Sequence, residues 1–380
     1  MTGFPPGAGA APGGNPAIAV VGIHGHGASH VKQAMSLEAA GRCQLVAVAD
    51  LRPPAADQNP FNVYSDLPSL LASEQPDIVV LSTPIHTHAP LAELALRAGA
   101  DVLLEKPTVA SLAEFDHLQQ VLDETGRSCQ VGFQAHGSGA VLALAKMVAD
   151  GTLGELRGIG ATGSWVRTQA YWQRAKWVGR RTLDGVPVVD GAVTNPFAHS
   201  IAAALLIDGS GRADQIESVE TDLYRANPIE ADDTSTVRIR TTRGTTIVAA
   251  LTLCAAENSP PQVTVYGSKG HAVLRYISDE LVVGPKTTQY GRQELLANLL
   301  DHRTDGVPLM APLSETGGFM QVLDAVRAAP APVEIAAEWV GDGDERHPVV
   351  PGIEQWIEQA AERQLLFSEL WNQQNRSFAR

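Results

Sequence analysis

The sequence predicts an α/β protein of two domains, in which a doubly wound parallel sheet precedes an α+β domain with a large, mostly antiparallel sheet. The length of 380 residues exceeds what one hydrophobic core usually supports, because domains commonly contain about 100–200 residues. Short apolar runs alternate with helical segments in the N-terminal third, which is typical of buried parallel strands. Longer segments of alternating polar and apolar residues follow, which is typical of antiparallel strands.

Composition and charge exclude several classes of protein. The 44% hydrophobic and 18% charged residues are typical of a globular protein, and no apolar run approaches the ~18 residues that cross a bilayer. The net charge of -14 would repel a phosphate backbone, which argues against nucleic acid as the main partner. Cys43, Cys129 and Cys254 form no CxxC pair, so we expect neither disulfides nor a zinc ribbon, and a cytoplasmic location.

The first domain is expected over residues 17–135, after a disordered tail at 1–16 that is rich in Gly, Pro and Ala and resembles no signal peptide. Strands are predicted at five short apolar runs, near 17–21, 44–50, 77–82, 101–104 and 129–133. Helices are predicted between them from their apolar spacing, near 28–40, 67–73, 90–98 and 111–125. This β-α-β alternation predicts strands that run parallel to one another.

The second domain is expected over residues 136–380. Its sheet is predicted from alternating segments at 216–224, 234–241, 245–253, 262–266 and 271–276. Four helical segments are expected to cover one face of that sheet, at 140–150, 197–206, 293–301 and 314–328. Another helix is expected near 353–371, and no function is assigned to the chain after about residue 338.

The turn after the first strand contains most of a dinucleotide-binding pattern. Gly22 and Gly27 occupy the first and last positions of GxGxxG, while His24 takes the middle position and Gly25 follows it. The outer glycines allow a tight turn and a close approach of helix and strand, and the helix N-terminus can receive a pyrophosphate. The residues expected to bind the cofactor here are Gly22, Ile23, His24, Gly25, His26 and Gly27. The alternative is a Gly-rich turn that binds no ligand.

Asp50 strengthens the case for a dinucleotide. It ends the second strand, roughly 20 residues beyond the glycines, where a carboxylate binds the adenosine ribose hydroxyls. Its charge would repel a 2′-phosphate, which favours NAD over NADP. Arg52 would soften that repulsion and permit some use of NADP.

Five histidines lie in the loops at this edge of the predicted sheet: His24, His26, His30, His86 and His88. Imidazole is a common zinc ligand, so a metal cluster is one interpretation. No cysteine or paired carboxylate accompanies the histidines within these loops. We therefore expect no metal.

Further motifs resemble a known family. They are Ser82-Thr83-Pro84, His88, the segment ALRAGADVLLEKP that ends in Glu105, Lys106 and Pro107, and VGF at 131–133. In order and spacing these motifs resemble the glucose-fructose oxidoreductase, inositol dehydrogenase and rhizopine-catabolism (Gfo/Idh/MocA) family. The match covers about residues 17–135 and continues more weakly through the segment after Trp165, the His199 segment, EADDT at 230–234 and YGSKG at 266–270.

The resemblance implies an N-terminal Rossmann domain and a second domain with an open-faced sheet. Such proteins often form homodimers or homotetramers through that sheet, and their substrates are commonly sugars, polyols or cyclitols. The resemblance also implies that residues from several loops border the cofactor, namely Ser82, Thr83, Pro84, His88, Glu105, Lys106 and Gln134.

Lys106 is the first candidate catalytic residue. It follows a predicted strand, at the mouth of the expected cleft, where a cationic nicotinamide would push its amine toward the neutral form. It would then hydrogen-bond the reacting hydroxyl. The alternative is a surface lysine that caps Glu105, and the resemblance favours the catalytic role.

Asn195 and His199 are the other catalytic candidates, because four residues separate them and place them on one face of a helical turn. In many relatives an Asp takes the place of Asn195. An amide cannot exchange a proton, so Asn195 is expected to orient the substrate and His199 to act as general acid or base. Asp190 is a candidate substitute carboxylate, and a packed structural histidine is the alternative for His199.

Aromatic and arginine residues are concentrated between these motifs. The residues expected to bind substrate are Trp165, Arg167, Tyr171, Trp172, Trp177 and Arg180, together with Asp190. Aromatic faces bind the apolar faces of sugar rings, and arginines bind hydroxyls or carboxylates. The alternative is a protein interface or a buried sheet edge, for which Trp and Arg are equally suited.

These features favour an NAD(P)-dependent oxidoreductase that transfers a hydride between a secondary alcohol of a sugar, cyclitol or glycoside and the nicotinamide ring. One alternative is a glycosidase or lyase that retains NAD and oxidises its sugar only transiently. Another is a non-catalytic nucleotide-sensing regulator, which would keep the glycine turn and Asp50 but could lack Lys106 and His199.

Overall fold

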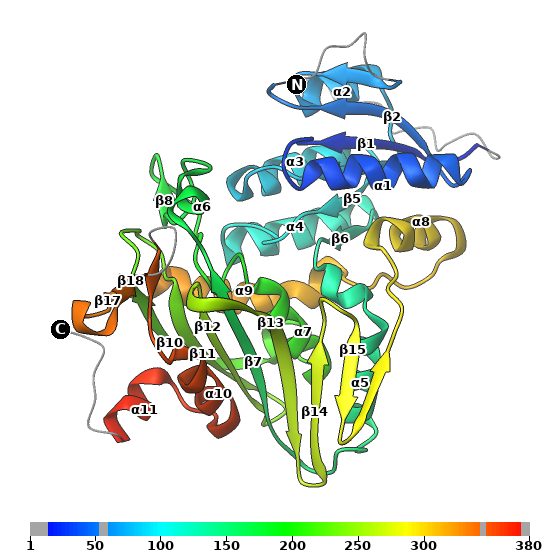
Figure 1. Cartoon of the computed structure of the whole chain (residues 1–380). Helices are drawn as coiled ribbons and strands as arrows, with labels where there is room; N and C mark the ends of the chain where they lie inside the picture. Colours follow the sequence, from blue (N-terminus) through cyan, green and yellow to red (C-terminus); the bar gives the residue numbers. More distant parts are fainter. Residues whose placement is uncertain (1–13, 53–59, 343–346, 374–380) are drawn as a thin grey trace. The chain divides into compact units, whose positions relative to one another are not determined.

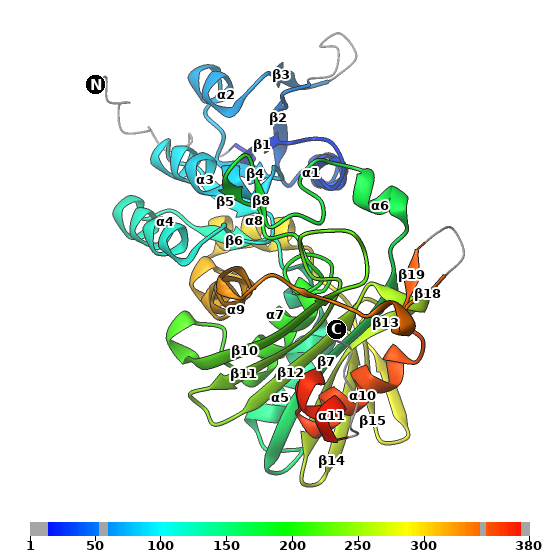
Figure 2. The same ribbon diagram turned by 90° about the vertical axis from the view of Figure 1, so that its left-hand side faces the viewer.

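The computed structural model describes residues 14–52, 60–342 and 347–373 (Figures 1 and 2). Most of the predicted N-terminal tail lies outside these ranges. The chain divides into two compact units, Met1–Phe133 with Gln293–Leu313, and Gln134–Arg292 with Ser314–Arg380. Among the described residues, no helix has both the length and the apolar character needed to span a membrane.

The first unit contains a six-stranded parallel sheet in the order β3-β2-β1-β4-β5-β6. The strands are β1 (Ala17–Val21), β2 (Gln44–Ala49), β3 (Asn62–Tyr64), β4 (Ile78–Leu81), β5 (Asp101–Leu104) and β6 (Cys129–Val131). The order reverses between β1 and β4, as it does in a doubly wound Rossmann sheet, so the predicted fold class is confirmed. Strand β3 was not predicted, because three partly exposed residues carry little periodic signal.

The helices of this unit are α1 (Gly27–Ala39), α2 (Leu67–Ser73), α3 (His88–Arg97), α4 (Leu112–Thr125) and α8 (Leu295–Asp305). Local chemistry sets the ends of α4: the Ser111 hydroxyl accepts a hydrogen bond from the Glu114 amide, and Gly126 ends the helix with a left-handed φ of 61°. Helices α1 and α8 pack on one face of the sheet, while α3 and α4 pack against each other on the opposite face (Figure 2).

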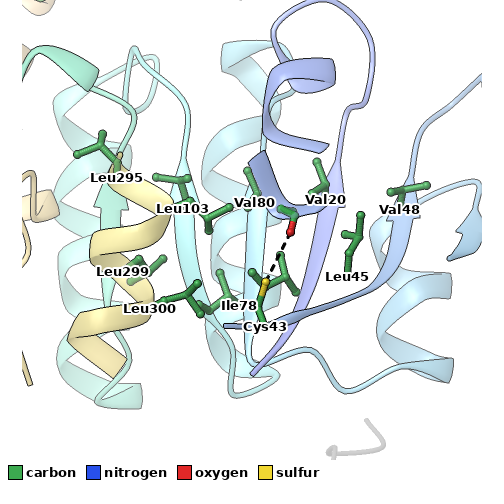
Figure 3. Close-up of a cluster of buried hydrophobic side chains, with 13 residues drawn as sticks. Val20, Cys43, Leu45, Val48, Ile78, Val80, Leu103, Leu295, Leu299 and Leu300 are labelled. Carbon is green, nitrogen blue, oxygen red and sulfur yellow. Dashed lines mark hydrogen bonds between the residues drawn. The ribbon is translucent and has the colours of Figure 1, made fainter. Parts of the chain in front are cut away.

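Helix α8 corrects one prediction. The segment 293–301 was expected to cover the second sheet, but α8 packs on the parallel sheet, where its leucines meet Ile78 and Leu103 (Figure 3). Arg303 of α8 also pairs with Asp77 and Asp101 at the amino-terminal edge of that sheet. Apolar spacing predicts that a segment is helical, but it does not say which of two apolar sheet faces the helix will cover.

The second unit contains a nine-stranded sheet in the order β16-β15-β14-β13-β7-β12-β11-β10-β17. The strands are β7 (Leu156–Val166), β10 (Ile216–Arg225), β11 (Thr234–Thr241), β12 (Thr246–Thr252), β13 (Cys254–Gly267), β14 (Gly270–Arg275), β15 (Glu280–Val283), β16 (Lys286–Gln289) and β17 (Val333–Glu334). Only β7–β12 and β10–β17 are parallel neighbours, so the prediction of a mostly antiparallel sheet is confirmed.

Helices cover both faces of this sheet. They are α5 (Gly139–Ala149), α7 (Ala198–Asp208), α9 (Gly317–Ala328), α10 (Ile353–Arg363) and α11 (Phe367–Gln373). A Cβ added at Gly163 of β7 would lie 2.2 Å from Phe197, just before α7, whereas one added at Gly160 would lie 2.8 Å from Ala361 of α10. Residues three apart on a strand face opposite sides, so α7 and α10 lie on opposite faces of the sheet.

The C-terminal segment differs from the single helix expected near 353–371. Gln364, with a φ of 57°, separates α10 from α11. The two helices form an apolar core with Tyr224 and Ala250 of the sheet, and the Arg238 guanidinium donates hydrogen bonds to Glu369 of α11. The face that the resemblance implied to be open is therefore covered over β10, β11, β12 and β7.

Short elements complete the second unit. They are the helix α6 (Gln169–Gln173), the hairpin β8 (Thr182–Leu183) with β9 (Val186–Pro187), and the pair β18 (Gly341–Asp342) with β19 (Pro348–Val349). Helix α6 and the β8–β9 hairpin lie in the segment for which the sequence predicts substrate binding.

Candidate active site

The β1–α1 turn is built by three glycines with different tasks. Gly22 has a φ of 81°, and a Cβ there would lie 2.3 Å from the carbonyl oxygen of Ser82. A Cβ at Gly27 would lie 1.7 Å from the carbonyl oxygen of Gly22, so only glycine allows α1 to approach β1 this closely. Gly25 supplies the second left-handed residue, with a φ of 59°, which frees position 24 for a histidine.

The start of α1 suits an anion. No side chain caps the helix at His26, and no acidic residue lies in its first turn. The positive end of the helix dipole is therefore available to a pyrophosphate. The residues present thus fit a dinucleotide.

Asp50 lies beside this turn at the end of β2. Its carboxylate accepts hydrogen bonds from the Ile23 amide at 3.0 Å and from the Arg52 amide at 2.9 Å. The His24 imidazole also faces it, with Nε2 at 3.6 Å from Asp50 Oδ1 and 3.1 Å from the Arg52 carbonyl oxygen. A carboxylate offers about four acceptor positions, so Asp50 retains capacity for ribose hydroxyls.

Glu105 forms a buried centre that was not predicted from the sequence. Its Oε1 atom lies 2.8 Å from His30 Nε2 and 3.3 Å from His26 Nε2. Burial opposes ionisation of this carboxyl, but its hydrogen bonds with His26 and His30 outweigh burial and hold the pKa of Glu105 well below its ordinary value. Gly132 leaves room for the carboxylate, because a Cβ there would lie 2.7 Å from Oε1.

The same three side chains have the spacing of a metal site: the ligand atoms of His26, His30 and Glu105 lie within 4.8 Å of one another. Both imidazoles, however, point at one carboxylate oxygen at hydrogen-bond distance. This geometry is already that of a satisfied hydrogen-bonded trio. The absence of a functional metal stays a prediction.

His88 connects the loop after β4 to the loop after β5. Its Nε2 lies 2.8 Å from the Thr83 carbonyl oxygen, and its Nδ1 lies 2.9 Å from that of Pro107, next to the cis peptide bond with Lys106. Burial lowers the pKa of His88, against the opposing effect of these carbonyls. His88 is only 1% exposed and holds the two loops together, and the contact with the cofactor expected of it stays a prediction.

In the second unit, Asp190 holds Asn195. The Asn195 Nδ2 donates to Asp190 Oδ1 at 2.6 Å, and the Gly179 amide donates to the other oxygen at 2.8 Å. Asp190 is 3% exposed and its carboxylate positions the amide of Asn195, while its contact with a substrate stays a prediction. His199 follows in the first turn of α7 and is half-buried. Lys106 belongs to the first unit, and its approach to His199 stays a prediction.

The predicted substrate segment forms a stack of alternating aromatic and arginine side chains, which we call the Arg–aromatic stack. Its members, in order, are Trp165, Arg167, Tyr171, Arg174 and Trp177. The Arg167 Cζ lies 4.7 Å from the ring centroid of Trp165 and 4.8 Å from that of Tyr171. The Arg174 Cζ lies 3.6 Å from the centroid of Tyr171 and 5.3 Å from that of Trp177. The segment is therefore ordered by cation–π contacts.

Other predicted substrate and cofactor residues have separate partners. Trp172 meets Tyr171 edge-to-face, with centroids 5.0 Å apart. Arg180 is not part of the stack, and its Nη1 lies 3.3 Å from Oε1 of Glu230. Gln134 lies in the second unit, where Arg292 Nη1 donates to its carbonyl oxygen at 2.5 Å.

Phe197 was absent from the predicted site, whereas Arg174 lies in the aromatic and arginine segment expected to bind substrate, and His30 was considered only as a metal ligand. His30 lies four residues after His26 on α1, and that spacing could have signalled that both imidazoles share one face. Phe197 stacks on Trp165 with centroids 4.5 Å apart, which links the stack to the start of α7. No sequence pattern indicates that contact, because it joins segments distant in the chain.

The doubly wound sheet, the glycine turn, the carboxylate at the end of β2 and the uncapped start of α1 define a dinucleotide-binding protein with a second, sheet-based unit. Comparison with known families specifies the class further. Residues 17–133 match the family described as "Oxidoreductase family, NAD-binding Rossmann fold", and residues 141–273 match the "GFO/IDH/MocA C-terminal domain". The chain belongs to the Gfo/Idh/MocA family of NAD-binding oxidoreductases.

Individual relatives agree with this assignment. The chain is 24% identical to an uncharacterised oxidoreductase from Synechocystis sp., over 76% of each protein. It is 26% identical to an inositol 2-dehydrogenase from Rhizobium meliloti, over 70% of this chain and 80% of the relative. Among solved structures, the WlbA dehydrogenase from Bordetella pertussis in complex with NADH and UDP-GlcNAcA has a similar fold, with a TM-score of 0.67 and 22% identity, over 82% of this chain and 95% of that one.

Proposed function

We propose that this chain is an NAD-dependent dehydrogenase that exchanges a hydride with a secondary alcohol of a sugar, cyclitol or glycoside. The observation that carries the proposal is in the second unit. There Asp190 fixes Asn195, and His199 lies in the first turn of α7. Phe197, between them in the sequence, packs on Trp165 of the Arg–aromatic stack. An acid–base group thus lies in the chain next to a surface that suits sugar rings. Two curated relatives named inositol 2-dehydrogenase support the substrate class.

The residues divide the chemistry between them. NAD, when bound, supplies the acceptor for the hydride that leaves the alcohol carbon. His199 takes the hydroxyl proton as that carbon becomes a ketone, and returns it in the reverse direction. Lys106 hydrogen-bonds the reacting oxygen, and the Asn195 amide, oriented by Asp190, fixes a neighbouring hydroxyl.

The preference for NAD over NADP follows from Asp50. Its carboxylate lies beside the turn and would meet a 2′-phosphate with like charge. Arg52 donates its amide to Asp50, and its exposed side chain is the cation that would offset that charge. We propose NAD as the working cofactor, with NADP accepted more weakly.

We also propose that the protein works in the cytoplasm as a homodimer or homotetramer. Its three cysteines are free and buried, which suits a reducing compartment. Helices α10 and α11 leave the outer face of β13 and β14 for association, where Thr264, Tyr266 and Val273 are half-buried. Light scattering of the purified protein measures its oligomeric state. A mass equal to that of one chain would rule out this association.

The test is an assay of the purified protein with NAD and a panel of sugars, inositols and glycosides. The absorbance of NADH reports the reaction. Steady NADH formation with one class of substrate is the expected result. Product without net NADH would instead identify an enzyme that retains NAD and oxidises its sugar transiently. Binding of NAD without any product would contradict the proposed catalysis and leave a nucleotide-sensing regulator.

A further inference from the structure

The segment 165–181 has a charge opposite to that of the whole chain. The chain carries 42 acidic and 28 basic residues, yet this segment contains no Asp or Glu. Its cations are Arg167, Arg174, Lys176, Arg180 and Arg181. A local excess of positive charge on an acidic protein concentrates anions at that place.

Two of these cations have partners within the protein. The Arg181 guanidinium donates to the carbonyl oxygens of Val326, Ala329 and others at the end of α9, which is a helix-capping role. Arg180 faces Glu230. Arginine side chains committed in this way stabilise the fold and have little capacity left for a ligand.

Arg167 and Arg174 are different. In the part of the chain that the structure describes, neither forms an ion pair, and their hydrogen bonds go to the carbonyl oxygens of Val166 and Tyr171. The Nε–H of Arg167 is buried without an acceptor among those residues. A buried donor left without an acceptor destabilises the protein, so a polar acceptor is expected at this position.

The aromatic rings hold both guanidiniums in defined places. Tyr171 lies between them, at 4.8 Å from the Arg167 Cζ and 3.6 Å from the Arg174 Cζ. Stacking of this kind occupies the faces of a guanidinium and leaves its edge, with the N–H groups, for a planar anion. Two cations fixed beside one ring give this part of the segment a localised positive charge.

The Arg–aromatic stack continues toward the proposed catalytic residues of the same unit. Trp165, at the first end of the stack, packs on Phe197 at 4.5 Å between ring centroids. Asn195 lies two residues before Phe197 and His199 two residues after it. A substrate whose hydroxyl meets His199 would therefore extend past Trp165 toward the N–H edges of the arginines.

We infer that the substrate is a sugar or cyclitol derivative with an anionic group, a carboxylate or a phosphate, which Arg167 and Arg174 bind. The inference rests on the proposed dehydrogenase function and specifies its substrate class. The competing explanation is that both arginines only stiffen the segment by stacking. That explanation predicts no difference between charged and neutral substrates.

The experiment compares Arg167→Gln and Arg174→Gln with the wild-type protein on four substrates: glucose, myo-inositol, glucuronate and glucose 6-phosphate. Glutamine keeps a polar side chain but removes the charge. Arg157→Gln is the matched control, because Arg157 is an exposed arginine at the other end of the same strand, β7. The dissociation constant for NAD is measured for each protein without sugar, so that an effect on the cofactor is recognised.

We expect a higher kcat/KM for glucuronate or glucose 6-phosphate than for glucose and myo-inositol. The preferred compound shows whether the anionic group of the substrate is a carboxylate or a phosphate. Each glutamine variant should raise KM for that anion by about tenfold or more, with NAD affinity unchanged and Arg157→Gln without effect. The wild-type KM should also rise with salt.

Two results overturn the inference. Equal turnover of neutral and charged sugars, with both variants active, would leave the dehydrogenase but remove the anion site. The second result is that no sugar, charged or neutral, yields NADH or binds the NAD-loaded protein. That result would contradict both the proposed function and the inference. Arg167→Lys keeps the positive charge. If charge rather than packing is responsible, this variant should bind the anionic substrate more tightly than Arg167→Gln does.

Discussion

At the β1–α1 turn, two glycines are constrained in different ways. A Cβ at Gly27 would lie 1.7 Å from the Gly22 carbonyl oxygen, so any side chain has to displace backbone. Gly25 has open space around it but a left-handed φ of 59°. We predict that Gly27→Ala abolishes NAD binding and lowers the free energy of unfolding by about 3 kcal/mol or more.

Gly25→Ala is the matched control for that variant. Alanine there only adopts a disfavoured conformation, so the free energy of unfolding should fall by about 1–2 kcal/mol, and NAD binding should weaken less than in Gly27→Ala. Urea unfolding measures the first quantity, and calorimetric titration with NAD the second. Equal effects of the two substitutions would contradict the close approach of α1 to β1.

His26 makes stability depend on pH through Glu105. Its hydrogen bond to Glu105 raises the pKa of His26 above the ordinary 6.5, although partial burial opposes the shift. Because the folded-state pKa is raised, protonated His26 contributes stability fully below pH 6.5, and the contribution is lost as pH rises through the folded-state pKa. We predict that His26→Gln removes this decline, measured by urea unfolding on both sides of pH 6.5.

The control for His26 is His271→Gln, which changes an exposed histidine on β14. That variant should keep the wild-type dependence of unfolding free energy on pH. An unchanged dependence in His26→Gln would mean that the contact with Glu105 contributes nothing to stability.

The site residues that could be predicted are those with a local signature. The glycines and Asp50 follow strands at fixed offsets, and they meet at one edge of the sheet as expected. The trio of His26, His30 and Glu105 could not be predicted in full, because Glu105 lies 75 residues from His30 in the sequence. Contacts over such distances depend on how the sheet brings its loops together.

At the scale of elements, short apolar runs identified β1, β4 and β5 because buried parallel strands have no polar face. Strand β7 was missed, although it lies at the centre of the second sheet. It contains Gly158, Gly160 and Gly163, which weaken the strand pattern and are needed where helices pack closely on both faces. Packing demands of this kind are invisible in a local window of sequence.

The C-terminal helices depend on an ion pair with the sheet. Arg238 is 8% exposed, and its Nη atoms donate to the two carboxylate oxygens of Glu369 at 2.7 and 2.9 Å. We predict that Arg238→Met lowers the free energy of unfolding by about 2–3 kcal/mol, because it leaves Glu369 and Glu220 without their cation. Arg240→Met changes an exposed arginine on the same face of β11, which acts on Glu220 and Glu369 only by its charge and without a hydrogen bond, so it should cost less, about 0.5 kcal/mol.

Urea unfolding measures the loss of unfolding free energy in the two arginine variants. Equal losses would show that α11 is held only by the apolar contacts that its own Phe367 and Leu370 make in the core. Proteolysis provides a second measurement, since a loosened α11 should be cleaved earlier in Arg238→Met than in Arg240→Met.

At the scale of the whole molecule, the residues proposed for the chemistry belong to two units. The first unit contains the glycine turn, Asp50 and Lys106, and the second contains Asn195, His199 and the Arg–aromatic stack. The chain crosses between the units three times, after Phe133, Arg292 and Leu313. Each unit is therefore completed by a segment distant in the sequence, which is why a single boundary near residue 135 did not describe the division.

The most direct measurement is of NADH formation by His199→Gln and Lys106→Met, alongside the dissociation constant for NAD. We predict that kcat/KM falls by about 10²–10⁴-fold in each variant while NAD still binds. Each substitution removes a group that we propose to contact the reacting hydroxyl. Wild-type rates in both variants, with the preferred substrate saturating, would contradict the account.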